Sequence, residues 1–307
     1  MHVEEVGDPA APLTVVFAHG YSVSMNSWYY QRRDLATEDV RLVFYDQRAH
    51  GRSGPSEQAS CTIDQLGEDL FAVIRDRVPR GPLVIVGHSM GGMSVLALAA
   101  EHPELFADRV TGVGLLSTSA GDLATVTFGL PAALVSAVRR ALPGLSVGMR
   151  RVPTALERRR LAGSDIGWVL TRRVGFGTLT TSPSLVSFLE REVASTPLPV
   201  IASFLPTLLD HDKLAAARVL RDTRTLVLVG DADVMTPLEH SRTIAQELPD
   251  AILVVVPGAG HAVILETPDI VNRHLRDLIE VGARAAGDLP AVPRSRDGSR
   301  RRTASEG

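Results

Sequence analysis

Residues 85–103 read IVGHSMGGMSVLALAAEHP. A short apolar run ends at Gly87 and an Ala- and Leu-rich segment begins near Met90, so the stretch predicts a buried strand, a sharp turn and a helix. Ser89 lies in the turn, and glycines at positions 87 and 91 permit the close backbone approach that such a turn needs. The pattern predicts that the Ser89 hydroxyl is presented at one edge of a sheet.

Similar apolar runs recur along the chain and predict further strands. Their near-continuous hydrophobicity is typical of parallel strands buried on both faces. With 82–87 included, the six runs cover residues 13–20, 40–46, 82–87, 110–118, 224–230 and 251–258. Helical patterns fall between them at about 65–78, 90–101, 238–248 and 268–284. The alternation predicts an α/β fold with a doubly wound, mostly parallel sheet.

One interval, residues 119–222, breaks this alternation. It holds no convincing strand and is punctuated by prolines. Because a loop of roughly a hundred residues without secondary structure is very unusual in a compact domain, we predict an inserted helical cap there. The α/β core would then comprise residues 1–118 and 223–285. Residues 286–307 are rich in Arg, Ser and Gly and predict a disordered tail.

Composition narrows the class of protein. The 307 residues are 45% hydrophobic and 22% charged, as in an ordinary packed domain, and the net charge of −3 gives no reason to expect a nucleic-acid partner. Cys61 is the only cysteine, so no intramolecular disulfide forms. The first residues show no signal-peptide pattern, and the longest uncharged run, 123–138, is short for a membrane span. We expect a cytoplasmic protein without stable membrane insertion; its oligomeric state is left open.

A serine hydroxyl needs a base to become a nucleophile, and the base needs a carboxylate to hold its tautomer. His261 follows the strand at 251–258, and both Asp231 and Asp233 follow the strand at 224–230. Carboxyl ends of parallel strands share one edge, so these groups should meet Ser89 there. Either aspartate, or Asp122 after the strand at 110–118, is a candidate acid at this point.

Other residues near these strand ends have a predicted role beside the nucleophile, the base and the acid, or a structural role. The backbone N–H of Met90, at a helix N-terminus, would point toward an oxyanion beside Ser89. We expect His88, Asp46 and His50 to be structural rather than catalytic. The sequence contains no Cys/His cluster with metal-ligand spacing and no G-x-G-x-x-G after the first strand, so neither a metal nor a nucleotide cofactor is predicted.

Five segments together resemble the α/β-hydrolase fold superfamily, in particular its capped, esterase- and lipase-like serine hydrolases. They are HGY (19–21), YDQRAHGRSG (45–54), GHSMGG (87–92), GDADVMTP (230–237) and GAGHAVILETP (258–268). The resemblance extends over residues 10–284. It implies Ser89 as nucleophile, His261 as base and Asp233 rather than Asp231 as the acid. It also implies the backbone N–H of Tyr21 as a second oxyanion-hole donor. Ala49 stands where the family usually has glycine.

The expected function is therefore a cofactor-free serine hydrolase that cleaves a carboxylic ester or thioester through an acyl-enzyme on Ser89. The same triad also serves carbon–carbon, lactone or amide hydrolysis and perhydrolysis in the family that the chain resembles. A ligand-binding, receptor-like protein with little turnover is the alternative from another class. The partner would be a small acyl substrate, with Trp28, Met93 and Trp168 as candidate pocket walls.

Overall fold

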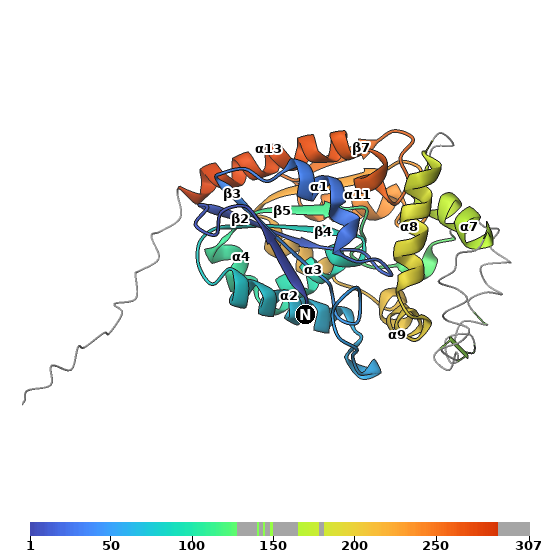
Figure 1. Cartoon of the computed structure of the whole chain (residues 1–307). Helices are drawn as coiled ribbons and strands as arrows, with labels where there is room; N and C mark the ends of the chain where they lie inside the picture. Colours follow the sequence, from blue (N-terminus) through green and yellow to red (C-terminus); the bar gives the residue numbers. More distant parts are fainter. Residues whose placement is uncertain (128–139, 141–143, 145–147, 150–164, 178–180, 288–307) are drawn as a thin grey trace, which may run out of the picture.

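A seven-stranded sheet forms the centre of the computed structural model, which describes residues 1–127, 140, 144, 148–149, 165–177 and 181–287. The strands lie in the order β1-β3-β2-β4-β5-β6-β7 (Figure 1). Only β1 is antiparallel to its neighbour. Their bounds are Val3–Val6 (β1), Leu13–Ala18 (β2), Val40–Tyr45 (β3), Leu83–His88 (β4), Val110–Leu116 (β5), Arg224–Gly230 (β6) and Ile252–Val256 (β7). The predicted doubly wound, mostly parallel α/β fold is confirmed.

The first strand, β1, is the element that the sequence pattern missed. Its sequence, VEEV, is only four residues long, carries two charges and is not buried. It pairs with one side of β3 at the edge of the sheet, from Val3 opposite Tyr45 to Val6 opposite Leu42. A short, charged edge strand lacks the continuous apolar pattern by which the central strands are recognised.

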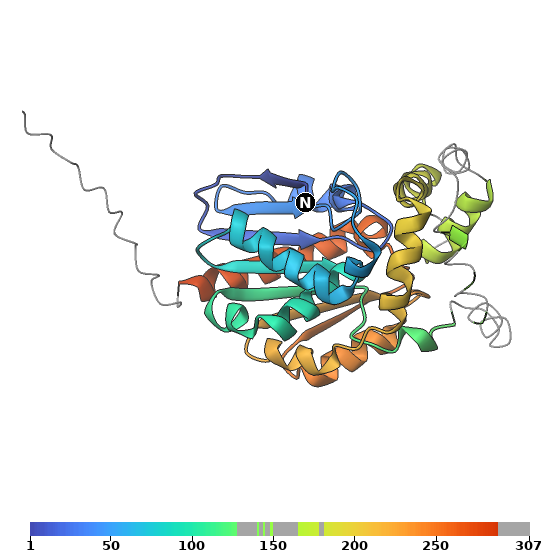
Figure 2. The same cartoon turned by 90° about the horizontal axis from the view of Figure 1, so that it is seen from below.

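Helices cover both faces of the sheet because successive residues of each strand point to opposite sides. In β2, Val15 and Phe17 belong to one apolar cluster, and Val16 and Ala18 belong to the other. The first cluster lies under α1 (Tyr29–Asp34), α12 (Val263–Glu266) and α13 (Pro268–Ala286). The second lies under α2 (Ile63–Arg77), α3 (Met90–Glu101), α4 (Pro103–Asp108), α10 (Leu214–Ala217) and α11 (Leu238–Glu247). Figure 2 shows the two helical layers from a second direction.

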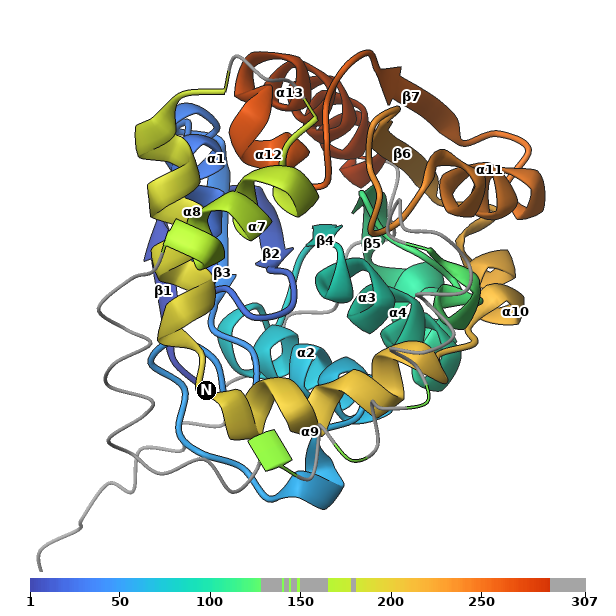
Figure 3. The ribbon, with the colours of Figure 1, turned by 90° about the vertical axis from the view of Figure 1, so that its right-hand side faces the viewer.

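Among the described residues, three further α-helices lie between β5 and β6 in the sequence: α7 (Asp165–Gly175), α8 (Pro183–Ser195) and α9 (Leu198–Leu209). They are arranged across the carboxyl ends of the parallel strands (Figure 3). We call them the cap helices. The boundaries predicted for the cap, 119–222, stay a prediction, because much of 128–164 lies outside the described residues. Nearly all of the predicted tail, 286–307, does so too.

Two of the cap helices are apolar enough to raise the question of a membrane. Within the residues that the structure describes, no single helix is long and apolar enough to cross one. The helices α8 and α9 meet the length and composition required only when taken as a pair, and that pair is bent by 92°.

Candidate active site

The turn between β4 and α3 places Ser89 in an unusual backbone conformation. Its φ is 53° and its ψ is −121°, a combination that costs free energy for a residue with a side chain. Neighbouring glycines make the turn sterically possible. A Cβ atom at Gly87 would lie 2.5 Å from the backbone of Gly91, and one at Gly91 would overlap the carbonyl group of Ala18. The strand therefore passes directly into the helix and leaves the Ser89 side chain at the carboxyl edge of the sheet.

Three side chains from separate strand ends form a hydrogen-bonded chain at this edge. The Nε2 atom of His261 lies 2.9 Å from Ser89 Oγ, and its Nδ1 atom lies 2.9 Å from Asp233 Oδ2. All three residues are less than 10% exposed. With the proton on Nδ1 donated to the carboxylate, Nε2 is free to accept the Ser89 proton. The structure thus brings together the three residues that the sequence selected.

The Asp233 carboxylate accepts hydrogen bonds from other groups in addition to His261. Oδ1 accepts hydrogen bonds from the backbone N–H groups of Met235 and Thr236, at 2.8 and 2.9 Å. Oδ2 accepts one from the hydroxyl of Thr236 at 2.8 Å. Burial alone would raise the pKa of Asp233, but electrostatic attraction to His261 and the hydrogen bonds from His261 and Thr236 outweigh it and keep that pKa below its usual value. Asp233 stays ionised in a water-poor setting.

Sequence reasoning missed Thr236. The signal was present in the spacing Asp233-Val-Met-Thr236, because an aspartate commonly accepts bonds from residues two and three positions later in a turn. That local pattern occurs in many turns. Only the contact with His261, whose Nδ1 lies 3.3 Å from Thr236 Oγ1, distinguishes this one.

The two other candidate acids lie elsewhere. The Asp231 carboxylate is exposed and accepts a hydrogen bond from the backbone N–H of Gly258 at 2.6 Å, so it joins two strand-end loops. Asp122 is exposed and precedes the short 3-10 helix η3 (Leu123–Thr125). Asp233 is the aspartate in contact with His261.

The two backbone groups predicted for an oxyanion hole flank Ser89. Met90 is the first residue of α3, where helix N–H groups have no partner within the helix. The loop after β2 passes on the other side: a Cβ atom at Gly20 would lie 3.3 Å from Ser89 Cβ, and Tyr21 comes next. The Tyr21 hydroxyl donates to the carbonyl oxygen of Ile201 in α9 and so joins this loop to the cap. Their role in binding an oxyanion stays a prediction.

His88 points away from the Ser89 hydroxyl. Its Nε2 lies 2.9 Å from the carbonyl oxygen of His261 and donates to it. Burial, followed by the proximity of His261, lowers the pKa of His88 to about 3. A neutral His88 that holds the backbone of His261 matches the structural role expected for it.

Asp46 and His50 belong to the loop after β3. The carboxylate of Asp46 accepts the backbone N–H groups of Met25 and Arg52, at 2.9 and 2.7 Å. The Nδ1 of His50 bonds to the carbonyl oxygen of Arg48 at 2.8 Å, and burial lowers the pKa of this histidine to about 3. Both side chains therefore organise loops, in agreement with the structural rather than catalytic role expected for them.

The candidate pocket walls have different surroundings. Trp28 is fully buried in the core, in an edge-to-face contact with Phe17, so the prediction that it lines a substrate pocket is corrected. Its position in the short helix η1 (Met25–Trp28) turns the ring into the sheet. Met93 packs in an apolar cluster with Phe204 of α9. Trp168 is half-buried and donates to the hydroxyl of Ser187 at 3.0 Å. Met93 and Trp168 stay predictions as pocket residues.

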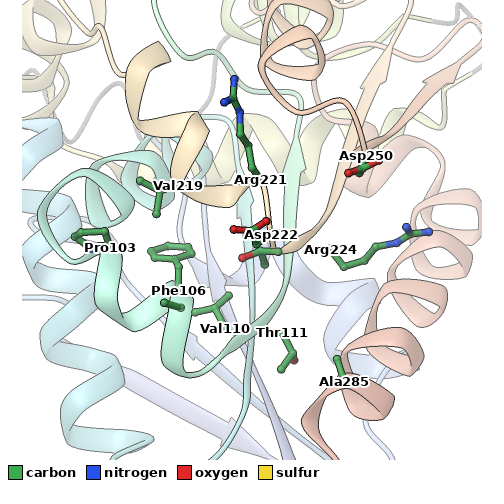
Figure 4. A pocket seen from close by; sticks show the side chains of 12 residues that line it. Pro103, Phe106, Val110, Thr111, Val219, Arg221, Asp222, Arg224, Asp250 and Ala285 are labelled. Carbon is green, nitrogen blue, oxygen red and sulfur yellow. The ribbon is translucent and has the colours of Figure 1, made fainter. Parts of the chain in front are cut away.

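A cavity of about 560 Å³ lies at the other end of the sheet (Figure 4). Its walls include Val110 and Thr111 at the start of β5, Arg224 at the start of β6, and Phe106 of α4. Ligands of open α/β sheets bind outside the carboxyl ends of the strands, where Ser89 lies. The cavity is therefore separate from the triad.

Comparison with known proteins agrees with this geometry. The family model described as the alpha/beta hydrolase fold matches residues 14–268. The chain belongs to this family. Proteins similar to it in sequence include ones named as an esterase, a putative carbamate hydrolase and a non-heme haloperoxidase.

Individual relatives are distant in sequence. A pimeloyl-[acyl-carrier protein] methyl ester esterase of Nitrosomonas europaea is 28% identical over 276 residues, which cover 88% of this chain and 95% of the relative. The dihydrolipoyllysine-residue acetyltransferase component of the acetoin cleaving system of Pseudomonas putida is 26% identical over 88% of this chain, which spans 63% of that relative's length. The solved esterase of Exiguobacterium antarcticum superposes with a TM-score of 0.73 at 19% identity, covering 91% and 95% of the two chains.

Proposed function

We propose that this α/β hydrolase is a serine hydrolase that cleaves a carboxylic ester or thioester through an acyl-enzyme on Ser89. The observation that carries the proposal is the continuous chain of contacts from Ser89 Oγ through the His261 ring to the Asp233 carboxylate, each at 2.9 Å. A relative that is named as a methyl ester esterase supports the choice of an ester.

The first half-reaction forms the acyl-enzyme. Ser89 Oγ attacks the acyl carbon while its proton passes to Nε2 of His261, and the negative charge of Asp233 stabilises the resulting imidazolium. The N–H groups of Met90 and Tyr21 would hold the oxyanion of the tetrahedral intermediate. Collapse of the intermediate breaks the bond to the leaving alcohol or thiol, which takes the proton back from His261.

The second half-reaction releases the acid. Water takes the place of the leaving group, gives a proton to His261 Nε2 and attacks the same acyl carbon. The second tetrahedral intermediate then expels Ser89, which recovers its proton from His261. The buried position of the triad favours these charge-stabilising contacts because little water competes with them.

The test is hydrolysis of p-nitrophenyl esters of graded chain length, with thioesters and lactones alongside. Ser89→Ala should lower kcat by about 10⁴-fold or more, judging from other triads. Ser117→Ala is the matched control, since Ser117 directly follows the neighbouring strand β5 and its buried hydroxyl has no hydrogen-bond partner among the described residues. Equal activity of the parent and the Ser89→Ala variant would refute the mechanism.

Covalent labelling separates the alternatives. A fluorophosphonate should modify Ser89 in the folded parent and leave Ser89→Ala unlabelled. Labelling combined with cleavage of lactones, amides or carbon–carbon bonds, but not of esters, would keep the nucleophile and change the substrate class. Absence of any adduct in folded protein would favour the ligand-binding, receptor-like alternative.

A further inference from the structure

The loop that carries His261 packs directly against the end of α7 and the residues that follow it. The backbone N–H of Ala262 donates to the carbonyl oxygen of Gly175 at 2.7 Å. A Cβ atom at Gly260 would lie 2.5 Å from the backbone nitrogen of Gly177, and one at Gly177 would overlap the carbonyl of Gly258. The cap thus touches the backbone on both sides of His261.

One carboxylate joins the two segments. Glu266, one turn after His261, accepts a hydrogen bond on Oε2 from the backbone N–H of Gly260 at 2.7 Å and from that of Gly177 at 3.1 Å. Its Oε1 accepts the hydroxyl of Thr181 at 3.1 Å. We call this set of three bonds the Glu266 clamp. A single side chain therefore ties the His261 loop to Gly177 and to Thr181 of the cap.

We propose that Glu266 is a positioning residue that fixes the His261 loop against the cap and so keeps the imidazole on Ser89. The inference rests on the serine-hydrolase function proposed above. Gly260, one of the clamped residues, is bonded directly to His261, so a shift of its backbone moves the ring. A displacement of about 1 Å in a catalytic group can lower a rate by on the order of 10²-fold.

The variants follow from the chemistry of the clamp. Glu266→Ala removes all three acceptor contacts. Glu266→Gln keeps these three contacts. The amide oxygen accepts the two glycine N–H groups, and the amide nitrogen donates to Thr181 Oγ1, because a hydroxyl oxygen can accept a hydrogen bond as well as donate one. Thr181→Val removes one of the three bonds and serves as a milder variant if Glu266→Ala does not fold.

Glu192 provides a matched control in another part of the cap. This carboxylate of α8 also accepts three bonds across the cap–core junction, from the N–H and hydroxyl of Ser24 and from the side chain of Asn26. These bonds hold a loop other than that of His261. Glu192→Ala therefore loosens the attachment of the cap and leaves the Glu266 clamp in place.

The experiment measures kcat and KM for the best p-nitrophenyl ester and the rate at which a fluorophosphonate labels Ser89. Glu266→Ala should lower kcat and the labelling rate by about 10- to 100-fold with KM changed by less than about threefold. Glu266→Gln should recover most of both rates, Thr181→Val should lose about three- to tenfold, and Glu192→Ala should keep kcat.

Three results would overturn the proposal: a kcat for Glu266→Ala equal to the parent's, an equal loss in Glu192→Ala, or no recovery in Glu266→Gln. If circular dichroism shows that Glu266→Ala does not fold, an unchanged kcat in Thr181→Val would overturn the proposal instead. Failure of the serine-hydrolase function itself would look different, since the parent would then be neither labelled nor active.

Discussion

Two aspartates only two residues apart have opposite environments. Asp233 is 4% exposed and receives hydrogen bonds from Thr236 and His261, whereas Asp231 is exposed and bonds to the backbone of Gly258. A buried carboxylate with several donors holds a fixed orientation, and an exposed one that supports a turn does not orient a base. The two residues therefore offer a test of the acid within one loop.

Asp233→Asn should lower kcat by about 10⁴-fold, because an amide cannot stabilise the imidazolium and favours the wrong tautomer of His261. Asp231→Asn is the control, and its amide oxygen still accepts the Gly258 N–H, so kcat should stay within about twofold of the parent. Steady-state kinetics on one ester, with circular dichroism to verify folding, measure both. A larger loss in Asp231→Asn would transfer the role of the acid to that residue.

The turn from β4 to α3 depends on elements that touch backbone to backbone. Gly91 in the first turn of α3 faces the carbonyl group of Ala18 at the end of β2, with no space for a side chain. Neither element can retreat, since β2 is hydrogen-bonded to strands on both sides and α3 is almost entirely buried. The position of Ser89 is thus fixed by the packing of a helix against a strand.

Gly91→Ala should destabilise the fold by about 3 kcal/mol or more, because a methyl group would be forced into the backbone of a central strand. Gly54→Ala is the matched control, since a Cβ atom there meets nothing within 4 Å. Urea unfolding followed by circular dichroism gives both free energies of unfolding. A Gly91→Ala variant as stable as Gly54→Ala would show that α3 can move away from β2.

Across the whole molecule, burial lowers the pKa of four histidines. Burial is the main cause in each case, and it lowers the pKa of His19 and His211 to about 4 and that of His50 and His88 to about 3, from the ordinary 6.5. Between about pH 4 and 6.5 the unfolded chain binds protons at these positions and the folded chain does not. Their contribution to stability is therefore complete above pH 6.5 and is lost as the pH falls toward 3–4.

We expect the free energy of unfolding to decrease between pH 6.5 and 4, with each of these histidines adding up to about 1.4 kcal/mol per pH unit to the slope. His211→Gln tests one of them, because its amide still donates to the carbonyl oxygen of Ser119, which His211 Nε2 contacts at 3.2 Å. Urea unfolding at several pH values should show that the free energy of unfolding of this variant depends less steeply on pH, by the equivalent of about one proton taken up on unfolding. An unchanged slope would mean that His211 is protonated in the folded protein.

The sequence by itself determined the class of fold and the order of the candidate catalytic residues. Continuous apolar runs such as 82–87 are a local property of strands buried on both faces, and the glycines around Ser89 are required by the turn itself. Parallel strands place their carboxyl ends at one edge, so the sequence alone predicted that Ser89 and His261 lie close together.

Tertiary structure alone decided what depends on partners distant in the chain. The contact of Thr236 with His261 and the clamp that Glu266 forms with Gly177 join segments 25 or more residues apart, and the complete burial of Trp28 turns a ring into the core. Sequence spacing carries no information on such contacts, because packing of one element on another sets them.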